Sequence, residues 1–168
     1  MAQSTPAPTL RAATPDDEAF LFEVYAATRQ AEFSFLAVDE EQKLALIKMQ
    51  YDIRRSQYDE GYPQAESSIV IVGDHPVGTI LINESEREIA LVDVALLPER
   101  RNAGIGSWLL RQLLDRAVKN GKPVRLQVMK SNPALRLYER LGFSRIEESS
   151  MYLEMIFEPP VSSRRNLN

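Results

Sequence analysis

The segment from Val92 to Leu110, VDVALLPERRNAGIGSWLL, places two glycines between an apolar run and an amphipathic helix. Gly104 and Gly106 allow the backbone to turn tightly and to approach a ligand closely. The N–H groups of a first helical turn have no partners inside the helix, and the helix dipole favours negative charge there. Arg100 and Arg101 add positive charge beside them. The segment is therefore suited to bind a phosphate group.

This glycine loop differs from two common nucleotide-binding fingerprints. A Walker loop needs a lysine followed by Ser or Thr after its glycines, and this segment has neither. A GxGxxG dinucleotide fingerprint needs a third glycine at the position that Leu109 occupies. A bare GxG also occurs in many structural turns, so the loop alone leaves open a purely structural role.

Turn residues, helix caps and apolar periodicity around this loop predict a mixed α/β fold. The run 89–97 is apolar on both faces apart from Asp93, which suits a buried central strand. Leucines recur at helical spacing over 104–120, and Gly121 follows as a stop signal. Further helices are predicted over 15–31, 40–60 and 132–142, and further strands over 10–13, 68–72, 77–83, 124–129, 144–146 and 151–157.

Two local signals support these boundaries. Asp39 is a suitable cap for the helix predicted over 40–60. The stretch from Gly73 to Pro76 separates two β-branched runs, which indicates a hairpin and makes His75 a predicted turn residue.

Length and composition favour one domain and exclude several kinds of site. The chain has 168 residues, of which 44% are hydrophobic and 26% charged, close to the globular average. We predict a single domain over 9–158 between disordered tails at 1–8 and 159–168. Cysteine is absent and His75 is the single histidine, which excludes thiolate metal sites, a cysteine nucleophile and paired-histidine metal sites. We therefore expect no metal.

Charge and hydropathy bear on partners and location. A net charge of −4 makes the chain a poor generic nucleic-acid binder. No apolar run reaches the roughly 18 residues of a transmembrane helix. The polar, proline-rich N-terminus lacks the apolar core of a signal peptide. A cytoplasmic location is the expectation, without a nucleic-acid or membrane partner.

A downstream segment changes the interpretation of the glycine loop. The residues from Gln127 to Phe143 read QVMKSNPALRLYERLGF. Together the two segments resemble the GNAT superfamily of acyl-CoA-dependent N-acetyltransferases. The stretch Arg101–Gly106 matches the R/Q-x-x-G-x-G/A loop of that family, and Asn132-Pro133-Ala134 with Leu137-Tyr138 matches its downstream signature. The strong resemblance covers 89–143.

The resemblance implies a mixed, mostly antiparallel central sheet, flanked by helices and splayed where coenzyme A lies. The strand 89–97 would pair its backbone with the pantetheine arm near Leu96, and the amides from Asn102 to Ser107 would hold the pyrophosphate. The acetyl group would pass directly to an amine, without a covalent enzyme intermediate. The cofactor-binding residues implied are Leu96, Arg101, Asn102, Ala103, Gly104, Ile105, Gly106, Ser107, Asn132, Ala134 and Tyr138.

The resemblance also suggests a general acid. Tyr138 matches the tyrosine that protonates the departing thiolate in the family, and a phenol with a pKa near 10 can donate at neutral pH. Without the resemblance, Tyr138 would be interpreted as a core residue of an amphipathic helix. Many members place an asparagine seven residues before this tyrosine. Here Ser131 occupies that position and Asn132, a typical helix cap, is six before, so either residue could contact the cofactor.

The general base has a weaker signal. Many members carry a glutamate where this sequence has Val92. The adjacent Asp93 is the only ionisable residue of its strand, and an acid there is costly unless it is paired or functional. Asp93 is therefore a candidate to line the acceptor site as amine anchor or base, and the alternative is a structural hydrogen-bond partner of the backbone.

The acceptor pocket is expected from the first half of the chain, around 33–38 and the second predicted helix. Aromatic and acidic side chains there would suit a cationic amine, although each could equally belong to an ordinary helix pair with an acidic rim. These residues are Phe33, Phe35, Asp39, Glu40, Glu41, Tyr51, Asp52, Tyr58 and Tyr62.

The sequence therefore predicts an acyltransferase that uses acetyl-CoA and a primary amine, either a small amine or a peptide N-terminus or lysine. A non-catalytic coenzyme A-binding sensor is the alternative, because the glutamate is missing at Val92. A nucleotide binder that uses the same loop is disfavoured by Tyr138 and the Asn-Pro-Ala segment. Family members are often dimers, so a homodimer is a further expectation.

Overall fold

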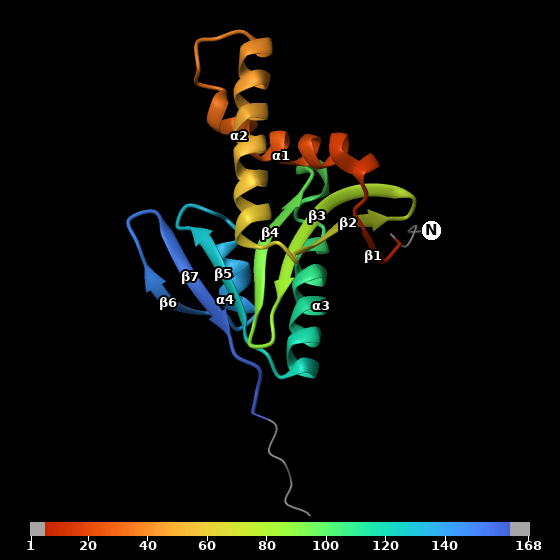
Figure 1. Ribbon diagram of the computed structural model, residues 1–168, viewed down its shortest axis with the longest axis vertical. Helices are drawn as coiled ribbons and strands as arrows, with labels where there is room; N and C mark the ends of the chain where they lie inside the picture. Colours follow the sequence, from red (N-terminus) through yellow and green to blue (C-terminus); the bar gives the residue numbers. More distant parts are fainter. Residues whose placement is uncertain (1–5, 162–168) are drawn as a thin grey trace, which may run out of the picture. The chain divides into compact units, whose positions relative to one another are not determined.

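Capped helices and short turns divide the chain into the elements that Figure 1 labels. The structure is a computed structural model and describes residues 6–161. Its helices are α1 (Glu18–Phe33), α2 (Glu40–Gly61), α3 (Ile105–Asn120) and α4 (Leu135–Arg140), with 3-10 turns over Pro15–Asp17 and Pro98–Arg100. Its strands are β1 (Pro8–Ala12), β2 (Glu66–Val72), β3 (His75–Glu84), β4 (Ile89–Leu96), β5 (Val124–Met129), β6 (Ser144–Glu148) and β7 (Tyr152–Phe157).

Hydrogen bonding places these strands in the order β1-β2-β3-β4-β5-β7-β6. The pairs β1–β2, β2–β3, β5–β7 and β6–β7 are antiparallel. The pair β4–β5 is parallel and joins Ile89–Leu91 to Val124–Leu126. The predicted fold class, a mixed and mostly antiparallel sheet flanked by helices, is confirmed.

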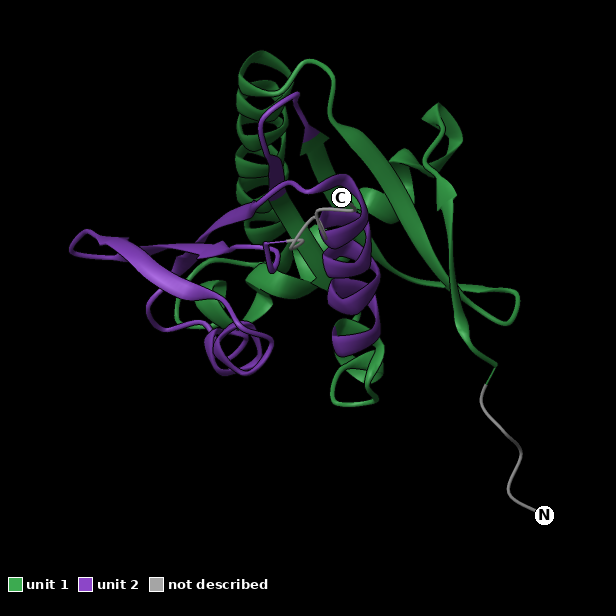
Figure 2. Ribbon diagram, turned by 90° about the horizontal axis from the view of Figure 1, so that it is seen from below, with its two compact units in different colours: residues 1–83, 92–106 green, residues 84–91, 107–168 purple. Residues whose placement is uncertain are grey.

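The chain forms two compact units, which Figure 2 colours separately. Unit 1 holds the described residues up to Asn83 together with Val92–Gly106. Unit 2 holds Glu84–Leu91 and the described residues from Ser107 onward. The prediction of one domain over 9–158 stays a prediction, and the tail residues 1–5 and 162–168 lie outside the described part of the chain.

In unit 1, a side-chain cap fixes the start of α2, and aromatic packing holds α2 against α1. Asp39 caps α2 as predicted, since its Oδ1 accepts a hydrogen bond of 2.8 Å from the N–H of Gln42. Tyr51 on α2 is buried, and its ring centroid lies 5.4 Å from those of Phe22 and Tyr25 on α1. The two helices are thereby held together by side chains of the same aromatic cluster.

In unit 2, α3 buries one apolar face and β5 another. Leu109, Leu113 and Ala117 of α3 and Val124 and Val128 of β5 are all buried. Burial of such side chains contributes about 25 cal/mol per Å² of apolar surface.

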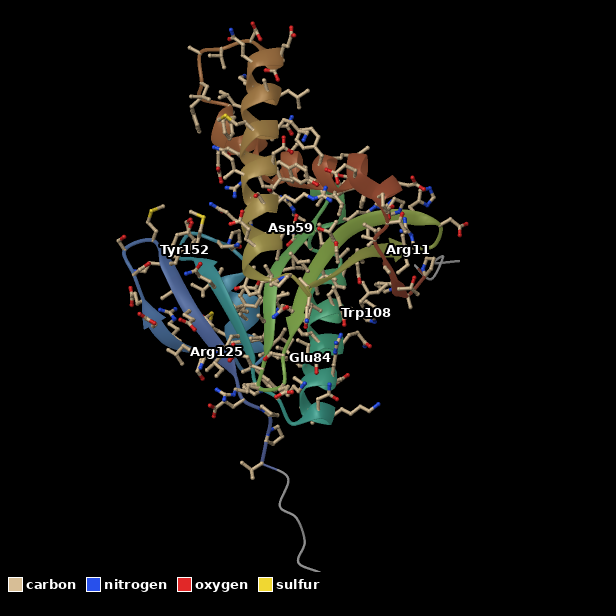
Figure 3. The ribbon with its side chains drawn as sticks, viewed as in Figure 1. Arg11, Asp59, Glu84, Trp108, Arg125 and Tyr152 are labelled. Atoms are coloured by element: carbon tan, nitrogen blue, oxygen red, sulfur yellow. The ribbon has the colours of Figure 1, made fainter. Side chains whose placement is uncertain are left out.

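A charged network lies at the end of α3 in this unit. Glu84, labelled in Figure 3, accepts hydrogen bonds from Arg116, Asn120 and Lys122. These bonds lower the pKa of Glu84, and they join α3 and Lys122, two residues beyond it, to Glu84 at the end of β3.

Several predicted boundaries shift for local reasons. His75 is the first residue of β3 and pairs with Val72, so its assignment to the turn is wrong. Gly73, at φ 63°, permits a two-residue turn, and the register shift after Val70 accommodates Pro76. Pro15–Asp17 forms a 3-10 turn before α1, and α4 begins only at Leu135.

Within residues 6–161, no helix combines the length and the apolar character that crossing a membrane requires.

We predict that Gly78→Ala destabilises the protein by about 1–3 kcal/mol, the usual cost of overpacking. An added Cβ would lie 2.5 Å from both the carbonyl oxygen of Ala95 and Cδ2 of Leu96 on β4. Gly61→Ala is the matched control, because its Cβ would meet no atom within 4 Å. Urea unfolding measures both. Equal stability of the two variants would show that β3 and β4 do not approach so closely.

Candidate functional site

The end of β4 continues into the glycine loop through a short turn. The N–H of Leu97 donates to the carbonyl of Val77 at 2.9 Å, which holds the strand end against β3. Arg101 turns back, and its Nε donates to the carbonyl of Leu96 at 3.1 Å. A carbonyl oxygen can accept two hydrogen bonds, so this contact leaves one acceptor position of Leu96.

The backbone from Asn102 to Gly104 is shaped to present its amides. Asn102 at φ 59° and Gly104 at φ 81° both have the left-handed conformation that creates anion-binding concavities. Among residues 6–161, no hydrogen bond engages the backbone N–H of Asn102, Ala103 or Gly104. A Cβ added at Gly104 would meet no atom within 4 Å. The loop is exposed, lies directly before the 16-residue helix α3, and its donors fit a pyrophosphate.

Asp93 on β4 is the centre of a second group of polar side chains in unit 1. Its Oδ1 lies 3.1 Å from Nη2 of Arg54 on α2. Nε of Arg54 donates to the Tyr58 hydroxyl at 2.6 Å. Arg54 therefore bridges the carboxylate of β4 and a phenol of its own helix.

Aromatic rings surround the two arginines of this group. The Arg54 guanidinium lies 5.1 Å from the ring centroid of Tyr58 and 5.8 Å from that of Tyr25. The Arg29 guanidinium lies 5.3 Å from the Tyr25 centroid. Sequence reasoning missed Tyr25, Arg29 and Arg54. The signal was a Tyr and an Arg four residues apart on each of two neighbouring helices.

The surroundings shift the ionisation of Asp93 and Tyr58. Burial raises the pKa of Asp93, against the opposing effects of the Arg54 and Arg29 charges and of the Val94 N–H. Burial and the nearby Asp93 raise the pKa of Tyr58 to about 12. With 34% of its side-chain surface exposed, Asp93 is accessible to a solute as well as paired. This geometry suits a group that exchanges a proton or binds a cation.

The remaining predicted site residues lie in unit 2. Tyr138 on α4 is buried, and its ring meets the edge of Phe143 at a centroid distance of 5.7 Å. Oδ1 of Asn132 accepts from the N–H of Ala134 at 2.9 Å, so this side chain orders the turn before α4. Ser131 is exposed beside it.

The predicted acceptor residues separate into several places. Tyr58 belongs to the group around Asp93, to which Arg54 links it. Tyr51 lies in the core, and Asp52 pairs with Lys48. Phe35 is 91% exposed. An open cleft of about 740 Å³ lies between α1 and α2, lined by Phe22, Glu23, Ala26, Ala27, Gln30, Phe33, Ser34, Glu40, Lys43, Leu44 and Ile47.

Within the part of the chain that the structure describes, no group of three or more His, Asp or Glu side chains could hold a metal ion.

The fold, with its glycine loop before α3, is that of an acyltransferase. The chain belongs to the acetyltransferase (GNAT) family, whose sequence model matches residues 10–143. It is thus an acyltransferase of the N-acetyltransferase type.

The chain is also similar to individual proteins and solved structures. A [ribosomal protein bS18]-alanine N-acetyltransferase of Haemophilus influenzae is 25% identical over 127 residues, which cover 75% of this chain and 82% of that protein. Solved structures share the fold. The PaiA N-acetyltransferase of Thermoplasma acidophilum, in complex with coenzyme A, has a TM-score of 0.68 at 18% identity, over 90% of this chain and 99% of that one. The ribosomal-protein-S18-alanine N-acetyltransferase of Escherichia coli has a TM-score of 0.65 at 16% identity, over 95% and 98% of the two chains.

We predict that Gly104→Val removes thermal stabilisation by coenzyme A. A ligand at about a hundred times its Kd stabilises by about 2.7 kcal/mol, which a melting curve detects. The valine side chain would occupy the open space above the unpaired amides. Differential scanning fluorimetry with coenzyme A, and with ATP and NAD for comparison, measures the shift in Tm.

Gly121→Val is the matched control, since Gly121 has φ 65° and equally empty surroundings but follows the C-terminus of α3. Both variants carry similar backbone strain. Only Gly104→Val should lose the coenzyme A shift. A normal shift in Gly104→Val would make this loop a purely structural turn.

Proposed function

We propose that the protein transfers the acetyl group of acetyl-CoA to a primary amine by direct attack within a ternary complex. The observation that carries this proposal is the set of unpaired amides at Asn102–Gly104, directly before α3, in a chain of the GNAT family. The coenzyme A bound in the Thermoplasma acidophilum relative is consistent with it.

The donor would be held mainly by backbone groups. We assign the pyrophosphate to the amides from Asn102 to Ser107, with Arg101 adding positive charge, and the pantetheine arm to the backbone near Leu96. We also assign cofactor binding to Asn132 and Ala134, with Ser131 as the alternative to Asn132. Backbone donors suit this task because their positions are set by the fold and cost little side-chain entropy.

The acceptor must lose a proton before it can attack. An alkylammonium with a pKa near 10 is mostly charged at neutral pH and has no free electron pair. Asp93 would bind this ammonium and receive its proton, directly or through water. Its raised pKa supports that role, because a more basic carboxylate accepts a proton more readily.

The leaving group also needs a proton. Acetyl-CoA supplies a thioester, and attack by the amine nitrogen on its carbonyl carbon forms the amide bond and breaks the C–S bond. The departing thiolate would take the hydroxyl proton of Tyr138, and the proton that the attacking nitrogen still loses as the amide forms would pass through water to restore the Tyr138 hydroxyl. The packing of the Tyr138 ring against Phe143 would hold this donor in one orientation.

The remaining assignments belong to the same proposal. The acceptor is a small amine or a peptide N-terminus or lysine, and the Haemophilus influenzae relative, which acts on an alanine of a ribosomal protein, favours an α-amine. We propose a cytoplasmic location and no nucleic-acid or membrane partner, with a homodimer as a further expectation.

The proposal is tested by following thiol release from acetyl-CoA with a panel of amines. The panel includes alkylamines, free amino acids, peptides with a free N-terminus and lysine peptides blocked at the N-terminus, and mass spectrometry identifies the acetylated atom. Release that depends on the amine and yields an N-acetyl product is the expected result. Coenzyme A binding without release for any amine would favour the non-catalytic alternative.

We predict that Tyr138→Phe lowers kcat by about 10²-fold, the low end for general acid catalysis, because water can partly replace the phenol. Its Kd for coenzyme A should change far less, since the ring packing is retained. Stopped-time assays and calorimetry measure the two quantities. A kcat unchanged with a good amine would assign Tyr138 to packing alone.

A further inference from the structure

The guanidinium of Arg29 on α1 has one edge without a partner. Its Nη1 donates to both carboxylate oxygens of Glu32, at 2.9 and 3.0 Å. Its Nε is buried and has no hydrogen-bond partner, and within residues 6–161 none is recorded for Nη2 either. The edge formed by Nε and Nη2 is one that binds a carboxylate through two parallel hydrogen bonds. A buried donor left unpaired is costly, so an acceptor group is expected there.

Arg54 provides an internal comparison. The same edge of Arg54 is filled, because Nε donates to the Tyr58 hydroxyl and Nη2 to Asp93. Both guanidinium groups lie within 6 Å of the Tyr25 ring centroid. Arg54 thus completes the protein's own network, whereas the Nε–Nη2 edge of Arg29 has no acceptor among the described residues.

The charges around this ring complement a zwitterion. Asp93 is accessible and lies 3.1 Å from Nη2 of Arg54, and the Arg29 charge acts to lower the pKa of Asp93. An acceptor with an ammonium and a nearby carboxylate would place the first at Asp93 and the second at Arg29. A simple alkylamine would leave the Arg29 edge unpaired.

We propose that Arg29 binds the carboxylate of the acceptor and that the acceptor is accordingly a free α-amino acid or a closely similar amino acid. This inference rests on the proposed function and deepens it by naming the substrate class. It places free amino acids above peptide N-termini, whose α-carboxyl group is already in an amide bond.

The test compares kcat/KM for free amino acids with that for the corresponding amino acid amides, in the wild type and in Arg29→Gln. The intrinsic basicity of each amine cancels when the acid-to-amide ratio is compared between variants. We expect that Arg29→Gln lowers this ratio about 10- to 100-fold, the range for a charged hydrogen-bonded pair. The change should lie mainly in KM. Arg29→Lys keeps the positive charge but cannot form the two parallel hydrogen bonds, so it should restore the ratio only partly.

Arg55→Gln is the matched control, because Arg55 lies on α2 of the same unit and pairs with the exposed Glu18. Its acid-to-amide ratio should equal that of the wild type. An equal ratio in Arg29→Gln and the wild type, or a preference for amides and peptides, overturns the Arg29 assignment while the acetyltransferase activity stands. Absence of thiol release with every amine overturns the proposed function instead.

A binding measurement gives a readout that is independent of turnover. N-acetylalanine carries the carboxylate but no free amine, and NMR titration can follow its binding to the protein saturated with coenzyme A. Weaker binding to Arg29→Gln than to Arg55→Gln supports the carboxylate site. Equal binding to the two variants contradicts it.

Discussion

An acidic side chain on a largely apolar strand requires a cation, and the Asp93–Arg54 pair meets that requirement in unit 1. This pair affects the packing of three elements, β4, α2 and α1. Because Arg54 must reach β4 from α2, its Nε is oriented by Tyr58 and its flat face lies near Tyr25 of α1. The Asp93–Arg54 pair therefore links three features of unit 1. It compensates a partly buried charge, it fixes how α2 packs, and it sets the chemistry of the candidate acceptor site. Removing one partner of such a pair would leave the other charge partly buried and uncompensated.

The donor side depends on backbone conformation and much less on side chains. Between the end of β4 and the start of α3, two residues adopt positive φ, and their amides find no partner within the described chain. Gly104 tolerates this conformation without strain, while Asn102 is one of the residues that adopt it more readily than most. A site of this kind would bind a shared chemical group, the pyrophosphate, and would carry no information about the acceptor. The donor motif of the family can therefore be recognised in the sequence, whereas the choice of acceptor depends on local side chains.

The two halves of the proposed chemistry make different demands on the fold. Tyr138 lies on a short helix, and its ring packs against Phe143, which in turn contacts Phe157 at a centroid distance of 5.9 Å. Asp93 lies on a strand, within reach of flexible arginine side chains. A rigid acid and an adaptable acceptor subsite would allow one reaction to be kept while the amine changes.

The sequence by itself determined most of the elements and located the glycine loop, because both depend on local signals. Each of these signals concerns only neighbouring residues: Asp39 as a helix cap, the leucine periodicity of α3, and the glycines at 104 and 106. The family resemblance then extended the prediction from single elements to the whole fold. The two-residue turn that places His75 in β3 escaped prediction, since it depends on pairing with Val72. Only the tertiary structure brought Arg29, Arg54 and Asp93 around Tyr25. Residues 39 positions apart, such as Arg54 and Asp93, meet through the packing of α2, for which no local pattern exists.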